Sequence, residues 1–138
     1  MKKLTLNLNN GLIKIDESPN PKLIEGYTLV KNIYSVVSPG TEKMLIQFGK
    51  QSFIKKFIKN LDRVALVLRK ISEEGFKSTY NKIENKLNLP IELGYSTCSI
   101  VENTTSKLLK KGDIVVTNGS HGDYSLVKNN LCIKAPAN

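Results

Sequence analysis

The chain is poor in the side chains that hold metal ions. It has a single histidine, His121, and two cysteines, Cys98 and Cys132, among 138 residues. Zinc prefers four nitrogen, sulfur or carboxylate ligands in a tetrahedral arrangement, so we expect no metal site within this chain. Each cysteine stands in an apolar, strand-like run. Such thiols are typically buried and reduced, which favours a cytoplasmic protein.

Long hydrophobic runs are also missing. No stretch approaches the roughly 18 consecutive apolar residues of a membrane span, and the N-terminal residues 1–8 alternate between polar and apolar instead of forming the continuous apolar core of a secretory signal. We therefore expect neither a membrane span nor a signal peptide.

Arginine is scarce although the formal net charge is +9. Residues 50–88 hold ten basic and four acidic residues, so most of the excess charge is local, and Arg63 and Arg69 are the only arginines in the sequence. Because recognition of phosphates and base edges favours arginine, we expect no nucleic-acid partner. A lysine-rich, solvated helical surface is the simpler interpretation.

The hydrophobic pattern predicts strands, then a helical block, then strands. Residues 3–17 read as a hairpin around Asn10-Gly11, and residues 28–37 as a strand that Pro39-Gly40 ends. Residues 52–88 show a helical period and predict two or three short amphipathic helices. Four more strands are expected over 96–103, 114–116, 122–128 and 131–135, with a Gly112-Asp113 turn before the second of them. This order predicts a mostly β, α+β domain and argues against a doubly wound sheet.

Five short motifs follow one another in a set order. They are Ser38-Pro39-Gly40-Thr41-Glu42, Leu93-Gly94-Tyr95-Ser96, Lys110-Lys111-Gly112-Asp113-Ile114-Val115, His121-Gly122-Asp123-Tyr124 and Leu131-Cys132-Ile133-Lys134-Ala135-Pro136. Together they resemble the N-terminal catalytic domain of the medium-chain dehydrogenase/reductase (zinc alcohol dehydrogenase-like) superfamily. The resemblance implies a GroES-like, partly open β-barrel over residues 1–138, with a helical insertion at about 50–88.

The positions that carry zinc ligands in this superfamily differ here. Its metal-dependent members read Cys-Gly-Ser/Thr-Asp in the first motif and Gly-His-Glu in the second. This chain has Pro39 (or Ser38, with a slip of one residue) in place of the cysteine, and Tyr95 and Ser96 in place of the histidine and glutamate. The chain thus resembles a zinc-free branch that includes bi-domain oxidoreductases of surface-polysaccharide and nucleotide-sugar metabolism.

The resemblance implies the substrate-side domain of a zinc-independent, NAD(P)-dependent oxidoreductase acting on a carbonyl or alcohol. In the family a Rossmann domain follows the strand that matches residues 131–136, and no Gly-x-Gly-x-x-Gly motif occurs in this chain. We expect NAD or NADP to be bound mainly by that missing domain, and this chain alone to be inactive. A fragment is favoured over a naturally split protein. The expected partners are a small-molecule substrate, the Rossmann domain and a second copy in a homodimer.

The same motifs supply the candidate site residues. Tyr95 takes the place of the family's histidine ligand and is a candidate hydrogen-bond donor or proton source, because a metal-free site needs one for the substrate oxygen. Thr41 is the second catalytic candidate and a possible contact of the cofactor. Ser38, Glu42 and Ser96 are expected to line the substrate cleft. We expect His121 to be a strand-edge or rim residue rather than a base.

Two other functions stay open. The first is a non-enzymatic binding module whose lysine-rich helices contact an anionic partner, which predicts a steep loss of binding with salt. The second is a ring-forming, co-chaperonin-like subunit, which predicts a large oligomer. In either case an incomplete barrel exposes unpaired strand edges, which favour self-association.

Overall fold

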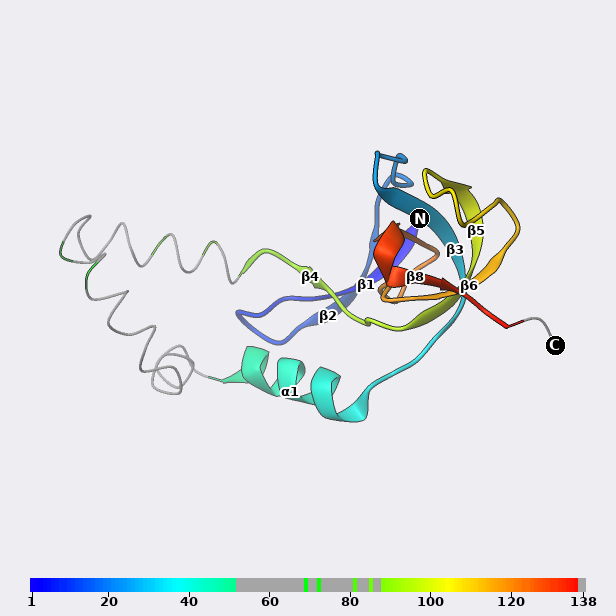
Figure 1. The fold of residues 1–138 in the computed structure, drawn as a ribbon. Coiled ribbons are helices and arrows are strands. Elements are labelled where there is room, and N and C mark those ends of the chain that lie inside the picture. The colour runs from blue at the N-terminus through cyan, green and yellow to red at the C-terminus, as the bar shows by residue number, and fades with distance from the viewer. Residues whose placement is uncertain (52–68, 70–71, 73–80, 82–84, 86–87, 137–138) are drawn as a thin grey trace. The chain divides into compact units, whose positions relative to one another are not determined.

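The computed structural model describes residues 1–51, 69, 72, 81, 85 and 88–136 (Figure 1). The chain divides into two compact units, of which the first contains Met1–Thr5, Lys14–Glu42 and Glu92–Asn138, and the second contains Leu6–Ile13 and Lys43–Ile91. The helices expected over 52–88, and most of the lysine-rich surface, lie outside the described residues and stay predictions.

A three-stranded sheet contains the predicted hairpin. Its strands are β1 (Lys2–Leu6), β2 (Ile13–Glu17) and β4 (Ile91–Glu92), in the order β2-β1-β4. The hairpin is confirmed, but its connection is wider than a two-residue turn, since the Asn7 N–H donates to the Leu12 carbonyl at 2.9 Å and the Gly11 N–H donates to the Asn7 carbonyl at 2.8 Å. Gly11 supplies the positive φ of this connection, at 71°, whereas Asn10 does not adopt one.

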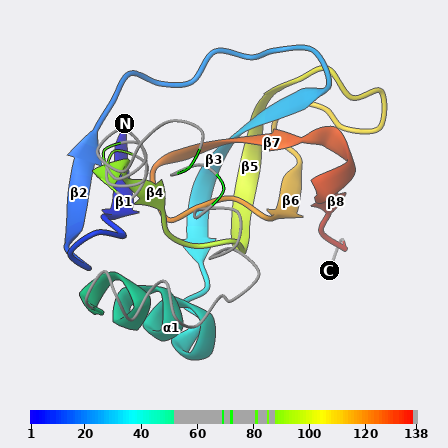
Figure 2. The same ribbon diagram turned by 90° about the vertical axis from the view of Figure 1, so that its left-hand side faces the viewer.

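A five-stranded antiparallel sheet holds the remaining strands. They are β3 (Tyr27–Ser35), β5 (Thr97–Thr104), β6 (Ile114–Thr117), β7 (Tyr124–Lys128) and β8 (Cys132–Lys134), in the order β7-β3-β5-β6-β8, with a 3-10 turn η1 (Asn129–Leu131) before β8. Figure 2 shows β3 and β5 side by side at the centre of this sheet. The mostly β, α+β prediction is confirmed, and the described residues form two sheets and no closed barrel.

One face of the five-stranded sheet is buried and has two different halves. Its apolar half contains Val30, Val101, Val115 and Val127, each at most 3 % exposed. Burial of this kind contributes about 25 cal/mol per Å² of apolar surface. The other half is lined by hydroxyl and amide side chains that bond to one another. Its members are Asn32, Thr97, Ser99, Thr117 and Ser125.

Helix α1 (Pro39–Lys50) was not expected from the sequence. Pro39-Gly40 does end the strand, as predicted, but it also begins a helix. The Glu42 N–H donates to the Ser38 carbonyl at 3.0 Å, which makes Ser38 the N-cap and puts Pro39 at the first helical position. Serine is a preferred N-cap, and proline is favoured at the first position because its missing N–H would have no partner there. The hydrophobic pattern predicts helices only from Ser52 onward, so it does not indicate this element.

Close backbone packing at two glycines joins α1 to the hairpin connection within the second unit. A Cβ on Gly49 would lie 2.6 Å from the Gly11 Cα. Both glycines are buried, and neither position has room for a side chain. This contact is set by backbone approach, which the hydrophobic pattern does not encode.

The described helices include none that could cross a membrane. Both cysteines are free thiols. Cys132 is buried, as expected, and burial raises the pKa of its thiol. Cys98 is only half-buried, because it lies on the opposite face of the sheet from the core.

Candidate functional site

The pairing of β3 with β5 brings two of the motifs together. Ser35 pairs with Thr97 at the end of the ladder, and the Val36 N–H then donates to the Ser96 carbonyl at 2.9 Å. The segment after β3 therefore runs beside the segment before β5. Residues 38 and 95 become neighbours although they are far apart in the sequence.

Tyr95 is an exposed residue at this place. Half of the Tyr95 residue surface is accessible. Side-chain hydrogen bonds to Ser38 and then to Thr41 lower the pKa of Tyr95 below its usual 10.0, while the carboxylate of Glu42 acts in the opposite direction. Hydroxyl donors favour the phenolate because they stabilise its negative charge. Tyr95 is therefore a stronger proton donor than an ordinary tyrosine.

A buried acid-histidine pair lies next to these hydroxyls. The Nε2 of His121 is 3.1 Å from the Oε1 of Glu42, and both side chains are 10 % exposed. The same Glu42 oxygen accepts the backbone N–H of Ser38 at 3.1 Å. An ionised carboxylate only accepts hydrogen bonds, so the imidazole carries its proton on Nε2. Glu42 thus joins His121 to the N-cap residue of α1.

The backbone of His121 links the site to two other segments. Its N–H donates to the Leu93 carbonyl at 2.7 Å, and its carbonyl accepts the Leu4 N–H at 2.8 Å. Gly94 has a φ of 91°, and a Cβ there would lie 2.7 Å from the His121 backbone nitrogen and 2.8 Å from the ring. The glycine before Tyr95 is therefore required twice, for its conformation and for its contact with the histidine.

Asn32 holds the residues on either side of His121. Its amide nitrogen donates to the Ser120 carbonyl at 3.1 Å and to the Gly122 carbonyl at 2.7 Å. Its amide oxygen accepts the Ser99 hydroxyl at 2.9 Å. The hydrophobic pattern contains no sign of this role, because an asparagine within a strand pattern is usually assigned to a solvent face.

The structure brings together four of the five predicted site residues. Ser38, Thr41, Glu42 and Tyr95 form one cluster, in which Thr41 and Tyr95 are exposed, Ser38 is half-buried and Glu42 is buried. Ser96 is half-buried beside them and contributes its backbone carbonyl. The sequence analysis missed the part played by His121, which is buried rather than placed at a rim. A lone histidine carries no spacing signal that would pair it with Glu42.

The positions that match the zinc ligands of the superfamily resembled by the sequence do not hold the usual donors of a zinc ion. Ser38 or Pro39, Tyr95 and Ser96 stand there and offer hydroxyl groups or no donor, whereas zinc takes thiolate, imidazole and carboxylate ligands. Within residues 1–51 and 88–136, no three histidine, cysteine, aspartate or glutamate side chains gather as a metal site requires.

A cavity of about 460 Å³ lies within the first unit, along β7. Glu92, Gly94, Ser120 and Tyr124 are among its lining residues, but Ser38, Thr41 and Tyr95 are not. The lining includes Gly94, so the cavity reaches the residue next to Tyr95. We do not assign the reacting atoms to it, because the hydroxyl cluster stands outside it.

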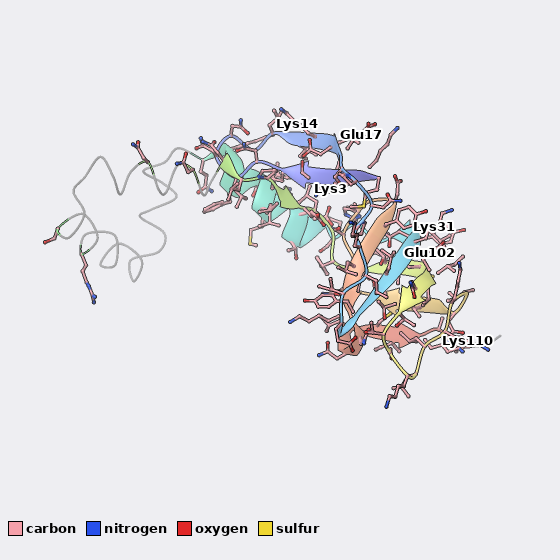
Figure 3. All side chains as sticks on the ribbon, turned by 90° about the horizontal axis from the view of Figure 1, so that it is seen from above. Lys3, Lys14, Glu17, Lys31, Glu102 and Lys110 are labelled. Atoms are coloured by element: carbon pink, nitrogen blue, oxygen red, sulfur yellow. The ribbon has the colours of Figure 1, made fainter. Side chains whose placement is uncertain are left out.

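Charged side chains on the described strands are mixed in sign. Figure 3 labels six of them, which come from β1, β2, β3, β5 and the turn before β6: Lys3, Lys14, Glu17, Lys31, Glu102 and Lys110. The Nζ of Lys3 bonds to the Glu92 carboxylate at 3.0 Å.

Solved structures with a similar fold include two quinone oxidoreductases and a protein solved with NADPH. The chain is similar to a quinone oxidoreductase from Coxiella burnetii, with 18 % identity and a TM-score of 0.61, over 97 % of this chain and 36 % of that one. It is also similar to the quinone oxidoreductase of Thermus thermophilus, with 12 % identity and a TM-score of 0.55, over 99 % of this chain and 32 % of that one. A mycobacterial protein solved with NADPH matches with 16 % identity and a TM-score of 0.54, over 100 % of this chain and 33 % of that one.

These likenesses show the fold. The chain spans about a third of the length of each of the three proteins. A comparison with protein-family models gave no match, and neither did a comparison with curated proteins.

Proposed function

We propose that this chain is the substrate-side domain of a zinc-independent, NAD(P)-dependent oxidoreductase that acts on a carbonyl or alcohol. The observation that carries the proposal is the exposed Tyr95 hydroxyl with a pKa lowered by Ser38 and Thr41. The fold shared with two quinone oxidoreductases and with an NADPH-bound protein supports it. The assignment of residues 1–138 to one domain, with an insertion at about 50–88, is part of the proposal.

In this proposal Tyr95 supplies the polarising group that a metal supplies elsewhere. Its hydroxyl donates a hydrogen bond to the carbonyl oxygen of the substrate. When a hydride adds to the carbonyl carbon, the electron pair of the C=O double bond moves to the oxygen, which takes the Tyr95 proton. The phenolate left behind is stabilised by Ser38 and Thr41 until it is reprotonated from solvent. In the oxidation direction the same groups act in reverse.

A nicotinamide cofactor, when bound, would supply or accept the hydride. The described residues contain no glycine-rich turn between a strand and a helix that could cradle its phosphates. We therefore place most of its binding on a separate dinucleotide-binding domain, with Thr41 as the one candidate contact in this chain.

The proposed substrate is a carbonyl compound, with a keto sugar or sugar nucleotide as the first choice and a quinone as the second. The sugar rests on the resemblance of the motifs to enzymes of surface-polysaccharide metabolism. The quinone rests on the names of two structural neighbours. Both present an oxygen to the same hydroxyl group, so the site chemistry is common to them.

Amide NMR of the full 138-residue chain tests the proposal directly. We expect a keto sugar or a benzoquinone, at millimolar concentration, to shift the amide signals of Ser38, Thr41, Tyr95 and Ser96, while the signal of Gly112 stays in place. Calorimetric titration with NADH and NADPH should show no micromolar binding. Micromolar affinity for either nucleotide, or shifts confined to other parts of the chain, would contradict the proposal.

A further inference from the structure

His121 is buried beside the candidate site, yet the proposed reaction does not use it. It is 8 % exposed, as is Glu42. A buried carboxylate with no partner is costly, and the 3.1 Å bond to Nε2 provides that partner. The ring of His121 bonds to Glu42 and not to the Tyr95 hydroxyl, so any effect that it has on the tyrosine is exerted through other residues.

The path from His121 to Tyr95 begins with two hydrogen bonds, each of 3.1 Å. Nε2–H donates to Glu42 Oε1, and that oxygen also accepts the Ser38 backbone N–H. Ser38 in turn bonds to the Tyr95 hydroxyl through its side chain. A change at His121 therefore reaches the tyrosine through two intermediate groups.

A second path runs through the backbone. The His121 N–H holds the Leu93 carbonyl, and the His121 ring fills the space where a side chain at position 94 would stand. Leu93 and Gly94 lead directly into Tyr95. The histidine thus touches the segment that carries the tyrosine and the carboxylate that holds its hydroxyl partner.

We propose that His121 is a positioning residue of this site, which fixes Ser38 and Thr41 around the Tyr95 hydroxyl through its bond to Glu42. The effect of His121 on catalysis rests on the proposed function, whereas its effect on the position of Ser38 and Thr41 does not. It assigns to the imidazole the task of holding a carboxylate in one place. It gives Glu42 the task of orienting the N-terminal turn of α1.

The test compares variants that keep or lose the donor at the Nε2 position. His121→Gln keeps an amide N–H of similar reach, whereas His121→Leu has similar bulk and no donor. His121→Asn is polar but too short to reach Glu42, and it serves if the leucine variant does not fold. The readout is the titration of the Tyr95 ring carbon by NMR, assigned with Tyr95→Phe among the five tyrosines of the chain.

We expect the wild-type Tyr95 midpoint to lie below 10.0 and to move back toward that value in His121→Leu and His121→Asn. His121→Gln should restore most of the wild-type midpoint. Glu42→Gln should lower the midpoint further, because it removes the negative charge that opposes ionisation while it keeps an acceptor for Ser38. Titration curves that superimpose in folded wild type, His121→Leu and His121→Asn would overturn the inference.

Catalysis is measured separately, in the protein that joins this domain to a dinucleotide-binding domain. A misplaced proton donor costs about 10²-fold in turnover, so we expect kcat to fall by about that factor in His121→Leu, with KM little changed, and to recover in His121→Gln. The titration needs neither cofactor nor substrate. If the midpoints shift as expected but Tyr95→Phe leaves turnover unchanged, the proposed function fails and the positioning role stands.

Discussion

Two glycine turns lead into neighbouring strands of the five-stranded sheet, and their glycines have nearly the same φ. Gly94 precedes β5 with a φ of 91°, and Gly112 precedes β6 with a φ of 90°. Each turn lies next to a carboxylate that is 8 % exposed, Glu42 at the first and Asp113 at the second. Because Thr97 pairs with Thr117 and Ile100 with Ile114, the two turns lie at opposite ends of the β5–β6 pair.

The partners of the two carboxylates differ. Asp113 accepts the Lys134 ammonium at 2.8 Å and the Lys110 backbone N–H at 3.0 Å, so it closes a turn and ties β8 to it. These bonds lower the pKa of Asp113, with the Lys134 hydrogen bond as the largest cause. Glu42 instead bonds to a histidine and to the N-cap of a helix beside accessible hydroxyls. The two carboxylates are equally buried, but Asp113 stabilises a turn and its contact with β8, whereas Glu42 belongs to the candidate site.

The largest expected effect is on turnover, which should depend on the residues near Gly94 and not on those near Gly112. In the protein that carries this domain together with a dinucleotide-binding domain, Tyr95→Phe should lower kcat by about 10²–10⁴, the usual contribution of a positioned general acid. Asp113→Asn is the matched control at the other turn, and turnover per folded molecule should be unchanged in it. Steady-state kinetics decide the matter, and equal losses in the two variants would contradict the comparison.

The pH dependence of reduction sharpens the same point. The donor form of Tyr95 is lost as the pH rises through its lowered pKa, so kcat should fall with increasing pH at a midpoint below 10.0. Tyr95→Phe should lack this limb. A wild-type profile that stays flat up to about pH 10, the ordinary tyrosine value, would show that another group provides the proton.

The next effect compares the two glycines by stability. Alanine at either position has to adopt a positive φ, which costs about 1–2 kcal/mol. At Gly112 nothing lies within 4 Å of the added Cβ, whereas at Gly94 it would meet the His121 backbone and ring below 3.0 Å. Overpacking of this kind adds about 1–3 kcal/mol. Urea unfolding should therefore show a loss of about 1–2 kcal/mol for Gly112→Ala and a clearly larger one for Gly94→Ala.

A smaller effect concerns how the free energy of unfolding decreases at acidic pH. The folded pKa of Asp113 lies below its unfolded value, so its contribution to stability is present above the usual range of an aspartate and is lost as the pH falls below it. Asp113→Asn removes this contribution at every pH. We expect the free energy of unfolding to decrease less between about pH 7 and about pH 3 in the variant than in wild type, as measured by urea titration at each pH.

The smallest expected effect is at the surface pair of Lys3 and Glu92. Its side chains are 25 % and 45 % exposed, and exposed ion pairs contribute about 0–1 kcal/mol. Lys3→Met should therefore cost less than about 1 kcal/mol by urea unfolding. The pKa of Glu92 should stay low in the variant, because its largest cause is the hydrogen bond from Ser120. A return of this pKa to the ordinary glutamate value would contradict that assignment.

Most of the strands could be predicted, because period-two alternation and glycine turns are local signals. The hairpin of β1 and β2, the turn at Gly112-Asp113 and the strands β3, β5, β6, β7 and β8 follow from them. Helix α1 could not be found in the same way, since its start depends on an N-cap at Ser38 that the Pro39-Gly40 turn signal conceals. The contact between Gly11 and Gly49 depends on backbone approach across the fold.

The sequence indicated which residues form the candidate site, but not how exposed they are or which of them are in contact. The resemblance of two motifs named Ser38, Thr41, Glu42, Tyr95 and Ser96. It did not say that the tyrosine would be exposed while the glutamate is buried. The pairing of Glu42 with His121 arises from distant segments of the chain, and a single histidine offers no period or spacing from which such a pairing can be deduced.

Asn32 is also a residue at which a chemical change would affect the site, because its amide nitrogen bonds to the residues on either side of His121. Deamidation would replace an amide nitrogen that serves the Ser120 and Gly122 carbonyls with an acidic oxygen that repels both. The segment between β6 and β7, which carries His121, would then lose two hydrogen bonds that tie it to β3, without any substitution in the gene. An Asn32→Asp variant reproduces the deamidated form. If the pH midpoint of its Tyr95 titration equals that of wild type, the hydrogen bonds of Asn32 do not affect the tyrosine.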